Sequence, residues 1–441
     1  MGPTPLYDAL RDFAGKKPLR MHMPGHKGKT LPIPELAAAA ALDVTELTPT
    51  GDLFAGGGPI AAAEKLWAQA LHMEECLFLT GGSTQGMHAA LLLACAPGER
   101  ILIDRGCHRS VYNALGLLDL RPVYLQRPWL EQEGILGALQ PEAVERALQE
   151  RPDIKTVCIT SPTYYGILSD VPAIAAVIHR RGGRLVVDGA HGAHLPFLGV
   201  DYLRGADLAA VSAHKTLPAL GQGALLLAGE GFSHGDLRRA GSVYGSSSPS
   251  YLLMAAMDVC RGWMEGEGGE RYRETAGGVR RMRAALPCLT ERAGRLDPTR
   301  LTVCTADGFA AQRALEAQGI YVEMADEGHV VCICTCMDGA QELARLEQAL
   351  SALPRGGRPV PPPPPAPEQA LSPRQALFSP RETLPLAQCA GRVSAQQIAP
   401  YPPGVPVVAP GERIEKKTVA YFQQIGYNIA EGVQTVPPRC V

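Results

Sequence analysis

The sequence predicts an α/β protein built on a mostly parallel sheet of seven strands. Three observations lead to this prediction. Short apolar runs recur between residues 76 and 229, and helical patterns separate most of them. The composition, with 46% hydrophobic and 20% charged residues, is that of an ordinary globular protein.

The seven predicted strands are residues 76–80, 100–105, 121–126, 156–160, 184–189, 208–213 and 223–229. Helices are expected between most of them, as in residues 171–183, where Pro172 suits the first helical turn and Gly182 or Gly183 can end it. The gap before the last strand is too short for a helical crossover. This strand is therefore expected to run antiparallel to its predecessor.

The sequence divides into four parts along the chain. Residues 1–275 are expected to hold an N-terminal segment and the large domain, and residues 276–357 a small α/β domain with strands at 300–306, 320–326 and 329–336. Residues 358–368 are rich in proline and read as an extended linker. Residues 369–441 form a C-terminal piece with a predicted helix near its middle.

Charge and cysteine usage exclude some classes of protein. The formal charge is −2, from 42 basic and 44 acidic residues, which argues against a nucleic-acid surface. No signal peptide or apolar run of about 18 residues is evident, so a soluble cytoplasmic protein is expected. Cys332, Cys334 and Cys336 are spaced for one buried face of a strand, with a metal or redox site as the alternative. His191 and His194 lack the partners of a metal site, and no metal is expected.

Three features fall where open α/β sheets bind ligands, at the carboxyl ends of parallel strands. The first is the stretch TGGSTQG at residues 80–86, in which a glycine turn follows a strand and Ser83 and Thr84 begin a helix. Free backbone N–H groups, hydroxyls and the positive helix end can hold a phosphate. A tight turn with a helix cap is the alternative.

The other two features each place a charge at a strand end. Asp188 ends an apolar strand in VVDGAH, where it either serves a ligand or caps the next turn. Lys215 follows the strand in SAHK. A partly buried lysine has a lowered pKa and can act as a Schiff-base nucleophile, whereas a lysine that reaches solvent has no such role.

Together these motifs resemble the fold type I enzymes that use pyridoxal 5′-phosphate. The flanking stretches MHMPGHKG (21–28), DRGCHRS (104–110), SAHKTLPALGQG (212–223) and PYPPGVPVVAPGE (400–412) resemble the Orn/Lys/Arg decarboxylase family in its shorter bacterial form. The resemblance runs in collinear order from about residue 4 to the C-terminus. It implies a decarboxylase that converts arginine, lysine or ornithine to the corresponding amine, in polyamine or diamine synthesis.

The resemblance also implies roles for individual residues. Lys215 is implied to bind the cofactor covalently, and Asp188 to pair with its pyridine nitrogen. His108 is implied to stack on one ring face and Ala190 to pack against the other; without the resemblance, His108 reads equally as a capping histidine. Four residues are implied to hold the phosphate: Ser83, Thr84, Ser212 and His214.

Substrate and proton-transfer residues are assigned less directly. Glu412 is the acid implied to hold a cationic substrate tail, with a solvated surface glutamate as the alternative. Lys215, Cys107 and His191 are candidates for the proton donor to Cα. The resemblance further implies a homodimer or larger assembly with a shared active site, to which residues 51–60 contribute.

Two other functions stay open. A fold type I aminotransferase or β-eliminating lyase is the first, although an aminotransferase would need an arginine in the small domain, and Arg313 looks exposed on a helix. A regulator that binds the cofactor without catalysis is the second. The combination of Lys215, Asp188 and His108 argues against it, because a pure binding role needs no electron sink.

Overall fold

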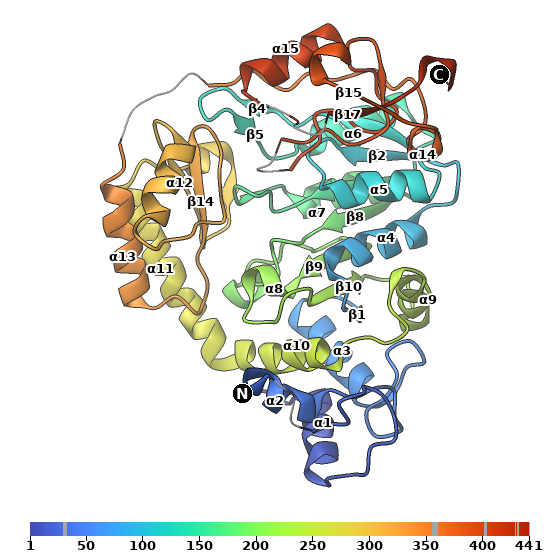
Figure 1. Ribbon diagram of the computed structural model, residues 1–441, viewed down its shortest axis with the longest axis vertical. Helices are drawn as coiled ribbons and strands as arrows, with labels where there is room; N and C mark the ends of the chain where they lie inside the picture. The colour runs from blue at the N-terminus through green and yellow to red at the C-terminus, as the bar shows by residue number, and fades with distance from the viewer. Residues whose placement is uncertain (30–32, 355–359, 401–403, 428, 430–431, 441) are drawn as a thin grey trace. The chain divides into compact units, whose positions relative to one another are not determined.

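The computed structural model describes residues 1–441 except 30–32, 355–359, 401–403, 428, 430–431 and 441 (Figure 1). The chain separates into two compact units. The first unit holds Met1–Leu93, Val186–Gly277 and Thr335–Gly339, and the second holds Ala94–Leu185, Gly278–Cys334 and Ala340–Val441. The four-part division expected from the sequence stays a prediction, and residues 358 and 359 of the expected linker lie outside the described part.

The central sheet has seven strands in the order β1-β10-β9-β8-β6-β2-β3. Their bounds are β1 Glu75–Leu79, β2 Arg100–Asp104, β3 Arg121–Leu125, β6 Thr156–Thr160, β8 Arg184–Asp188, β9 Leu208–Ser212 and β10 Ala224–Ala228. Strand β8 is parallel to β9, and β2 is parallel to both β3 and β6. Strand β10 is antiparallel to β9, so the expectation for the last strand is confirmed.

Helices of the first unit are α1 Pro5–Gly15, α2 Pro34–Leu42, α3 Gly58–Ala70, α4 Gly82–Ala94, α8 Ala213–Thr216, α9 His234–Tyr244 and α10 Tyr251–Trp263. Helix α11, Gly269–Ala285, begins in this unit. Helix α3 forms because Ile60, Ala63 and Trp67 recur at helical spacing, and all three are buried. The Trp67 indole donates a 3.2 Å hydrogen bond to the carbonyl oxygen of Met257 in α10.

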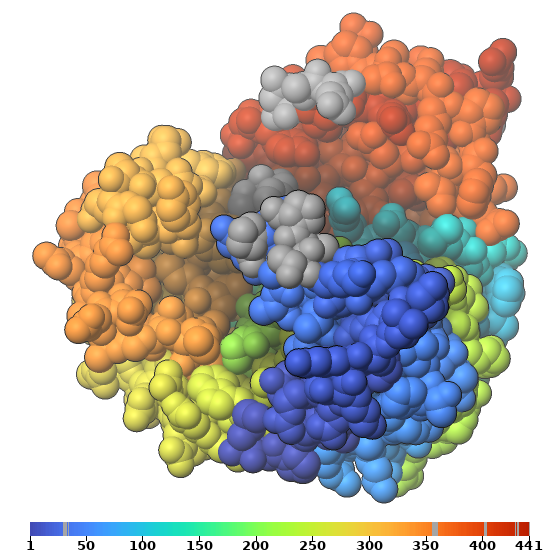
Figure 2. All heavy atoms as spheres, turned by 60° about the horizontal axis from the view of Figure 1, so that its bottom comes forward, coloured from blue at the N-terminus to red at the C-terminus, as the bar shows by residue number. Residues whose placement is uncertain are grey.

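The N-terminal segment, blue in Figure 2, lies on the surface of the first unit. Apolar side chains in this segment face solvent: Leu19 is 88% exposed, Met21 80% and Met23 59%. Such a concentration of exposed apolar side chains is typical of a surface that contacts another molecule.

The second unit contains two smaller sheets beside its part of the central one. One has the order β12-β14-β13 and the other β15-β17-β16. Its remaining strands are short. The bounds are β4 Trp129–Leu130, β5 Ile135–Leu136, β7 Ile167–Leu168, β11 Arg295–Leu296, β12 Arg300–Cys304, β13 Met324–Ala325, β14 His329–Ile333, β15 Glu382–Leu384, β16 Val393–Ser394 and β17 Val433–Val436.

Helices of the second unit are α5 Arg109–Leu117, α6 Pro141–Glu150, α7 Val171–His179, α12 Gly308–Glu316, α13 Ala340–Ser351, α14 Pro373–Phe378 and α15 Lys416–Gln424. In α7, Pro172 lies in the first turn as expected, and the Asp170 side chain caps the helix by accepting from the Ala173 N–H. Among the described residues, no helix is both long and apolar enough to cross a bilayer.

Two expectations for residues 320–336 need correction. The strand expected at 320–326 is reduced to Met324–Ala325, because Tyr321 is 82% exposed and only these two residues pair with β14. Cys332, Cys334 and Cys336 are all buried, as expected. However, β14 ends at Ile333, so only Cys332 of the three belongs to the strand.

Candidate active site

The glycine turn before α4 lies beside the segment that follows Lys215. The Gly82 N–H donates a 3.0 Å hydrogen bond to the carbonyl oxygen of Gln222, seven positions after Lys215 in the chain. Helix α4 also packs tightly on the sheet, since a Cβ added at Gly86 would lie 2.8 Å from the Cβ of Ala210 in β9. The first turn of α4, with Ser83 and Thr84, is therefore held at the carboxyl end of β9.

Lys215 lies in the short helix α8, three positions after the end of β9. Its side chain is half-buried, and its Nζ lies 3.2 Å from Nε2 of His191. His191 is itself buried, with 3% of its surface exposed. The structure thus directs the amine toward an interior imidazole. His214, next to Lys215, bonds through Nδ1 to the carbonyl oxygen of Gly223 at 2.9 Å.

Asp188 is the last residue of β8 and is 3% exposed. Its Oδ1 accepts a 3.2 Å hydrogen bond from the N–H of Ala190, as in a capped turn. In the parallel pairing of β8 with β9, Asp188 lies opposite Ala210, two positions before Ser212. Because neighbouring strands are about 4.8 Å apart, this register brings Asp188 and the SAHK segment to one sheet edge.

These residues suit a phosphorylated aldehyde cofactor. The hydroxyl oxygen of Ser212 is buried and has no hydrogen-bond partner in the described part of the chain. A buried hydroxyl without a partner is costly, so a bound acceptor at this point would satisfy it. The start of α4 adds backbone N–H groups and a positive dipole end, which favour a phosphate. Lys215 is a suitable amine for the aldehyde, and Asp188 is a suitable carboxylate for the ring nitrogen.

The second unit holds the other predicted site residues. His108 directly precedes α5, and its Nδ1 accepts from the N–H of Ser110 at 3.3 Å. The capping role considered for His108 is thus present. Cys107 is fully buried, and its thiol contacts the carbonyl oxygen of Cys158 at 3.9 Å.

Glu412 is fully buried, so it is not a solvated surface residue. Both of its carboxylate oxygens accept hydrogen bonds from Arg105, at 2.6 and 2.7 Å. Oε2 also accepts from the N–H of Ala409 at 2.7 Å. Burial raises the pKa of Glu412, and the hydrogen bonds and charge of Arg105 counteract that rise. A role for Glu412 in holding the substrate tail stays a prediction, and in this chain its charge is already paired.

We expect Arg105→Gln to lower the free energy of unfolding by about 3–5 kcal/mol, because it leaves the Glu412 carboxylate buried and unpaired. The double variant R105Q/E412Q should recover part of this loss, since it removes both charges. Urea unfolding of the three proteins measures the effect. Arg100→Gln is the control, because its ion pair with Asp153 is half exposed and contributes little. A loss in R105Q no larger than in R100Q would contradict the expectation.

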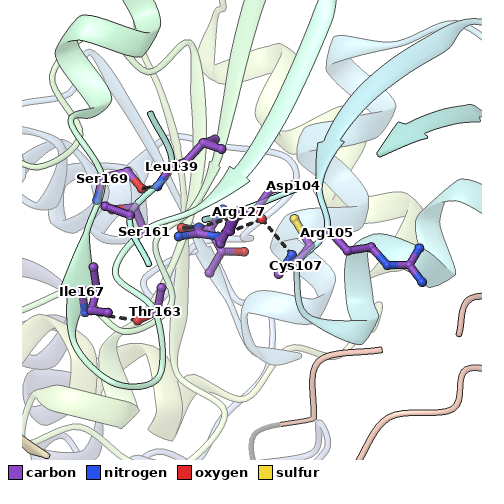
Figure 3. Close-up of polar contacts among 12 residues, drawn as sticks. Asp104, Arg105, Cys107, Arg127, Leu139, Ser161, Thr163, Ile167 and Ser169 are labelled. Carbon is purple, nitrogen blue, oxygen red and sulfur yellow. Dashed lines mark hydrogen bonds and ion pairs between the residues drawn. The ribbon is translucent and has the colours of Figure 1, made fainter. Parts of the chain in front are cut away.

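Sequence reasoning missed a second buried ion pair near His108, between Asp104 and Arg127 (Figure 3). Asp104 is fully buried, and Arg127 is 5% exposed. One feature of the sequence could have indicated this ion pair. Asp104 ends an apolar strand in the same way as Asp188 does, and a buried carboxylate requires a partner.

Comparison with known proteins assigns the family. The model of the Orn/Lys/Arg decarboxylase major domain matches residues 4–286, and that of the family's C-terminal domain matches residues 363–431. The chain belongs to the Orn/Lys/Arg decarboxylase family. It is therefore an enzyme of the pyridoxal-phosphate-dependent decarboxylase class that acts on basic amino acids.

The relatives agree with this assignment, and a solved structure shares the fold. The arginine decarboxylase of Bacillus subtilis (strain 168) is 31% identical over 95% of this chain and 93% of its own length. That of Bacillus anthracis is 30% identical over 99% of this chain and 95% of its own. Lysine decarboxylase of Francisella novicida has a similar fold, with a TM-score of 0.82 at 19% identity, over 98% of this chain and 81% of that chain.

Proposed function

We propose that this enzyme decarboxylates arginine in preference to lysine and ornithine. The observation that supports decarboxylation with pyridoxal phosphate at this site is the arrangement at the end of β8 and β9, where Lys215 contacts His191 beside the strand that Asp188 ends. The preference for arginine is supported by the relatives from two Bacillus species, which are about 30% identical over almost the whole chain and are named arginine decarboxylase.

Several residues are proposed to bind pyridoxal phosphate. Lys215 would hold it covalently, Asp188 would face the ring nitrogen, and Ala190 and His108 would contact the ring. The phosphate would lie among the side chains of Ser83, Thr84, Ser212 and His214. When bound, the cofactor supplies an electron sink for the pair left at Cα as carbon dioxide departs.

The surrounding residues have distinct tasks in this proposal. Asp188, buried and negative, keeps a proton on the ring nitrogen by opposite charge. His191, 3.2 Å from the Lys215 amine, can accept a proton from it or return one. Lys215 and His191 are thus the better placed donors to Cα. Cys107, enclosed in the second unit, stays a weaker candidate.

A substrate panel tests the proposed reaction. We expect carbon dioxide release from arginine with a kcat/KM at least about tenfold above that for lysine or ornithine. Tenfold corresponds to only about 1.4 kcal/mol, which is within what a site that recognises one polar group can provide. Manometry or coupled carbon dioxide assays measure the release. Equal rates on all three amino acids would contradict the preference. Keto acids in place of carbon dioxide would favour an aminotransferase, against which Arg313 already argues because it is exposed on α12.

We also propose a homodimer or larger assembly in the cytoplasm, in a pathway that makes polyamines or diamines. The exposed apolar side chains at residues 19–23 support a subunit contact. Light scattering of the purified protein would test the assembly. A monomer at micromolar concentration would overturn that part of the proposal.

A further inference from the structure

The loop that carries His108 begins at a buried ion pair that the proposed chemistry does not use. Arg127 donates from Nε to both Asp104 oxygens at 2.8 and 2.9 Å, and from Nη2 to Oδ2 at 2.5 Å. This is a fork on a carboxylate, which fixes both side chains in direction. In Figure 3, Arg105 points away from the pair, although it is the next residue after Asp104.

The pair also joins neighbouring parts of the second unit. Arg127 donates to the carbonyl oxygen of Gly137 at 3.0 Å and to that of Thr160, the last residue of β6. The Thr160 N–H in turn donates to Asp104 at 3.2 Å. The carboxyl ends of β2 and β6, which are neighbours in the sheet, are therefore tied together through these two side chains.

Asp104 also forms hydrogen bonds with the backbone of the loop at residues 105–108. Its Oδ1 accepts from the N–H of Gly106 at 2.7 Å, and its carbonyl oxygen accepts from the N–H of Cys107 at 3.0 Å. The loop lies directly on the pair, since a Cβ at Gly106 would be 3.0 Å from Nε of Arg127. His108 follows these two fixed residues and is the N-cap of α5, which begins at Arg109. The hydrogen bonds of Asp104 to Gly106 and Cys107 thus fix the backbone from which the His108 side chain projects.

Stability alone does not account for the pair. Burying two charges is expensive, and well-packed apolar side chains would stabilise the same position at least as well. An ion pair, in contrast, holds one geometry, which a site on a loop needs for accurate placement. The carboxyl end of a sheet is also where ligands bind in this class of fold.

We propose that Asp104 and Arg127 are positioning residues that hold His108 in the orientation in which it contacts the cofactor ring. This inference rests on the proposed role of His108. Neither residue is expected to touch the substrate or the cofactor. Their side chains form hydrogen bonds with the backbone of the loop and with the neighbouring strand ends.

A double-mutant cycle on the full-length holoenzyme tests the proposal. Asp104→Asn keeps the size of the side chain and removes its charge. We expect kcat to fall by about 10–100-fold with little change in KM, at a temperature where circular dichroism shows the folded protein. In the His108→Ala background, the same substitution should lower kcat no further, because its effect acts through His108. Arg127→Lys, which keeps the charge but not the fork, should lie between wild type and R127Q.

Two measurements do not depend on turnover. The absorbance spectrum of the bound cofactor should change in D104N in the same direction as in H108A. Amide hydrogen exchange of residues 105–108, and of Thr160, whose N–H donates to Asp104, should accelerate in D104N in the cofactor-free protein, with exchange elsewhere in the second unit unchanged. Tyr165→Phe is the matched control, because it also removes a buried side-chain hydrogen bond in the same unit, the one to Asp326.

The outcomes separate this inference from the function on which it rests. Additive losses in D104N and H108A, or a lower melting temperature with unaltered kcat and spectrum, would overturn the positioning role and leave the decarboxylase intact. A wild-type protein that binds no pyridoxal phosphate would overturn the proposed function instead. An H108A variant with normal kcat and spectrum would refute the proposed role of His108 and the inference together.

Discussion

Replacing Lys215 by alanine is expected to abolish turnover, with a loss in kcat of at least about 10³-fold. In the proposed reaction this amine binds the cofactor aldehyde covalently, and it also exchanges a proton with His191, whose Nε2 lies 3.2 Å away. Alanine has no amine, so K215A can neither bind the aldehyde covalently nor transfer the proton. Carbon dioxide release from arginine at saturating pyridoxal phosphate measures the loss.

Covalent attachment gives this prediction a second readout. Borohydride reduction of the wild-type holoenzyme should fix the cofactor on the peptide that contains Lys215, as peptide mass spectrometry would show. In K215A, reduction should leave no cofactor on that peptide. Lys65→Ala is the control, because Lys65 is exposed on α3 and belongs to the same unit. Near-normal turnover in K215A would end the proposed chemistry.

Local sequence patterns predicted most of the central sheet. Each of its seven strands was expected to within one residue at either end, because short apolar runs between helical patterns identify buried strands. The same signal weakened outside this sheet. Residues 320–326 carry β-branched and aromatic side chains, yet Tyr321 and Glu323 are exposed and only two residues pair. Propensity alone does not reveal which residues find a pairing partner.

The candidate site was predictable in part for a similar reason. Lys215, Asp188 and the glycine turn each follow a strand, and parallel strands bring their carboxyl ends to one edge. The partner of Glu412 was not predictable. Arg105 is 307 positions away along the chain, and no local pattern links a residue in the C-terminal piece with one that follows β2. Arg127 was missed because an isolated arginine after a strand reads as a surface residue until its burial is known.

The substitution Asp188→Asn is expected to lower kcat by about 10²–10³-fold while the protein still binds the cofactor. Asparagine has nearly the same size and can still accept the hydrogen bond from the Ala190 N–H, so the turn after β8 should persist. What the variant loses is a negative charge in a position that is 3% exposed, where water screens it little. Without that charge the ring nitrogen loses its proton more easily, and the electron sink weakens.

Two comparisons isolate the charge as the cause. Asp188→Ala removes the side chain as well, so its loss in kcat should be at least as large, with weaker cofactor binding. Asp201→Asn, at an exposed position of the same unit, should leave both kcat and cofactor affinity unchanged. Reconstitution of the cofactor-free proteins with pyridoxal phosphate, followed by absorbance, separates affinity from turnover. If D188N bound the cofactor and turned over normally, Asp188 would be only a turn cap, and the carboxylate that holds the ring nitrogen would have to be sought elsewhere.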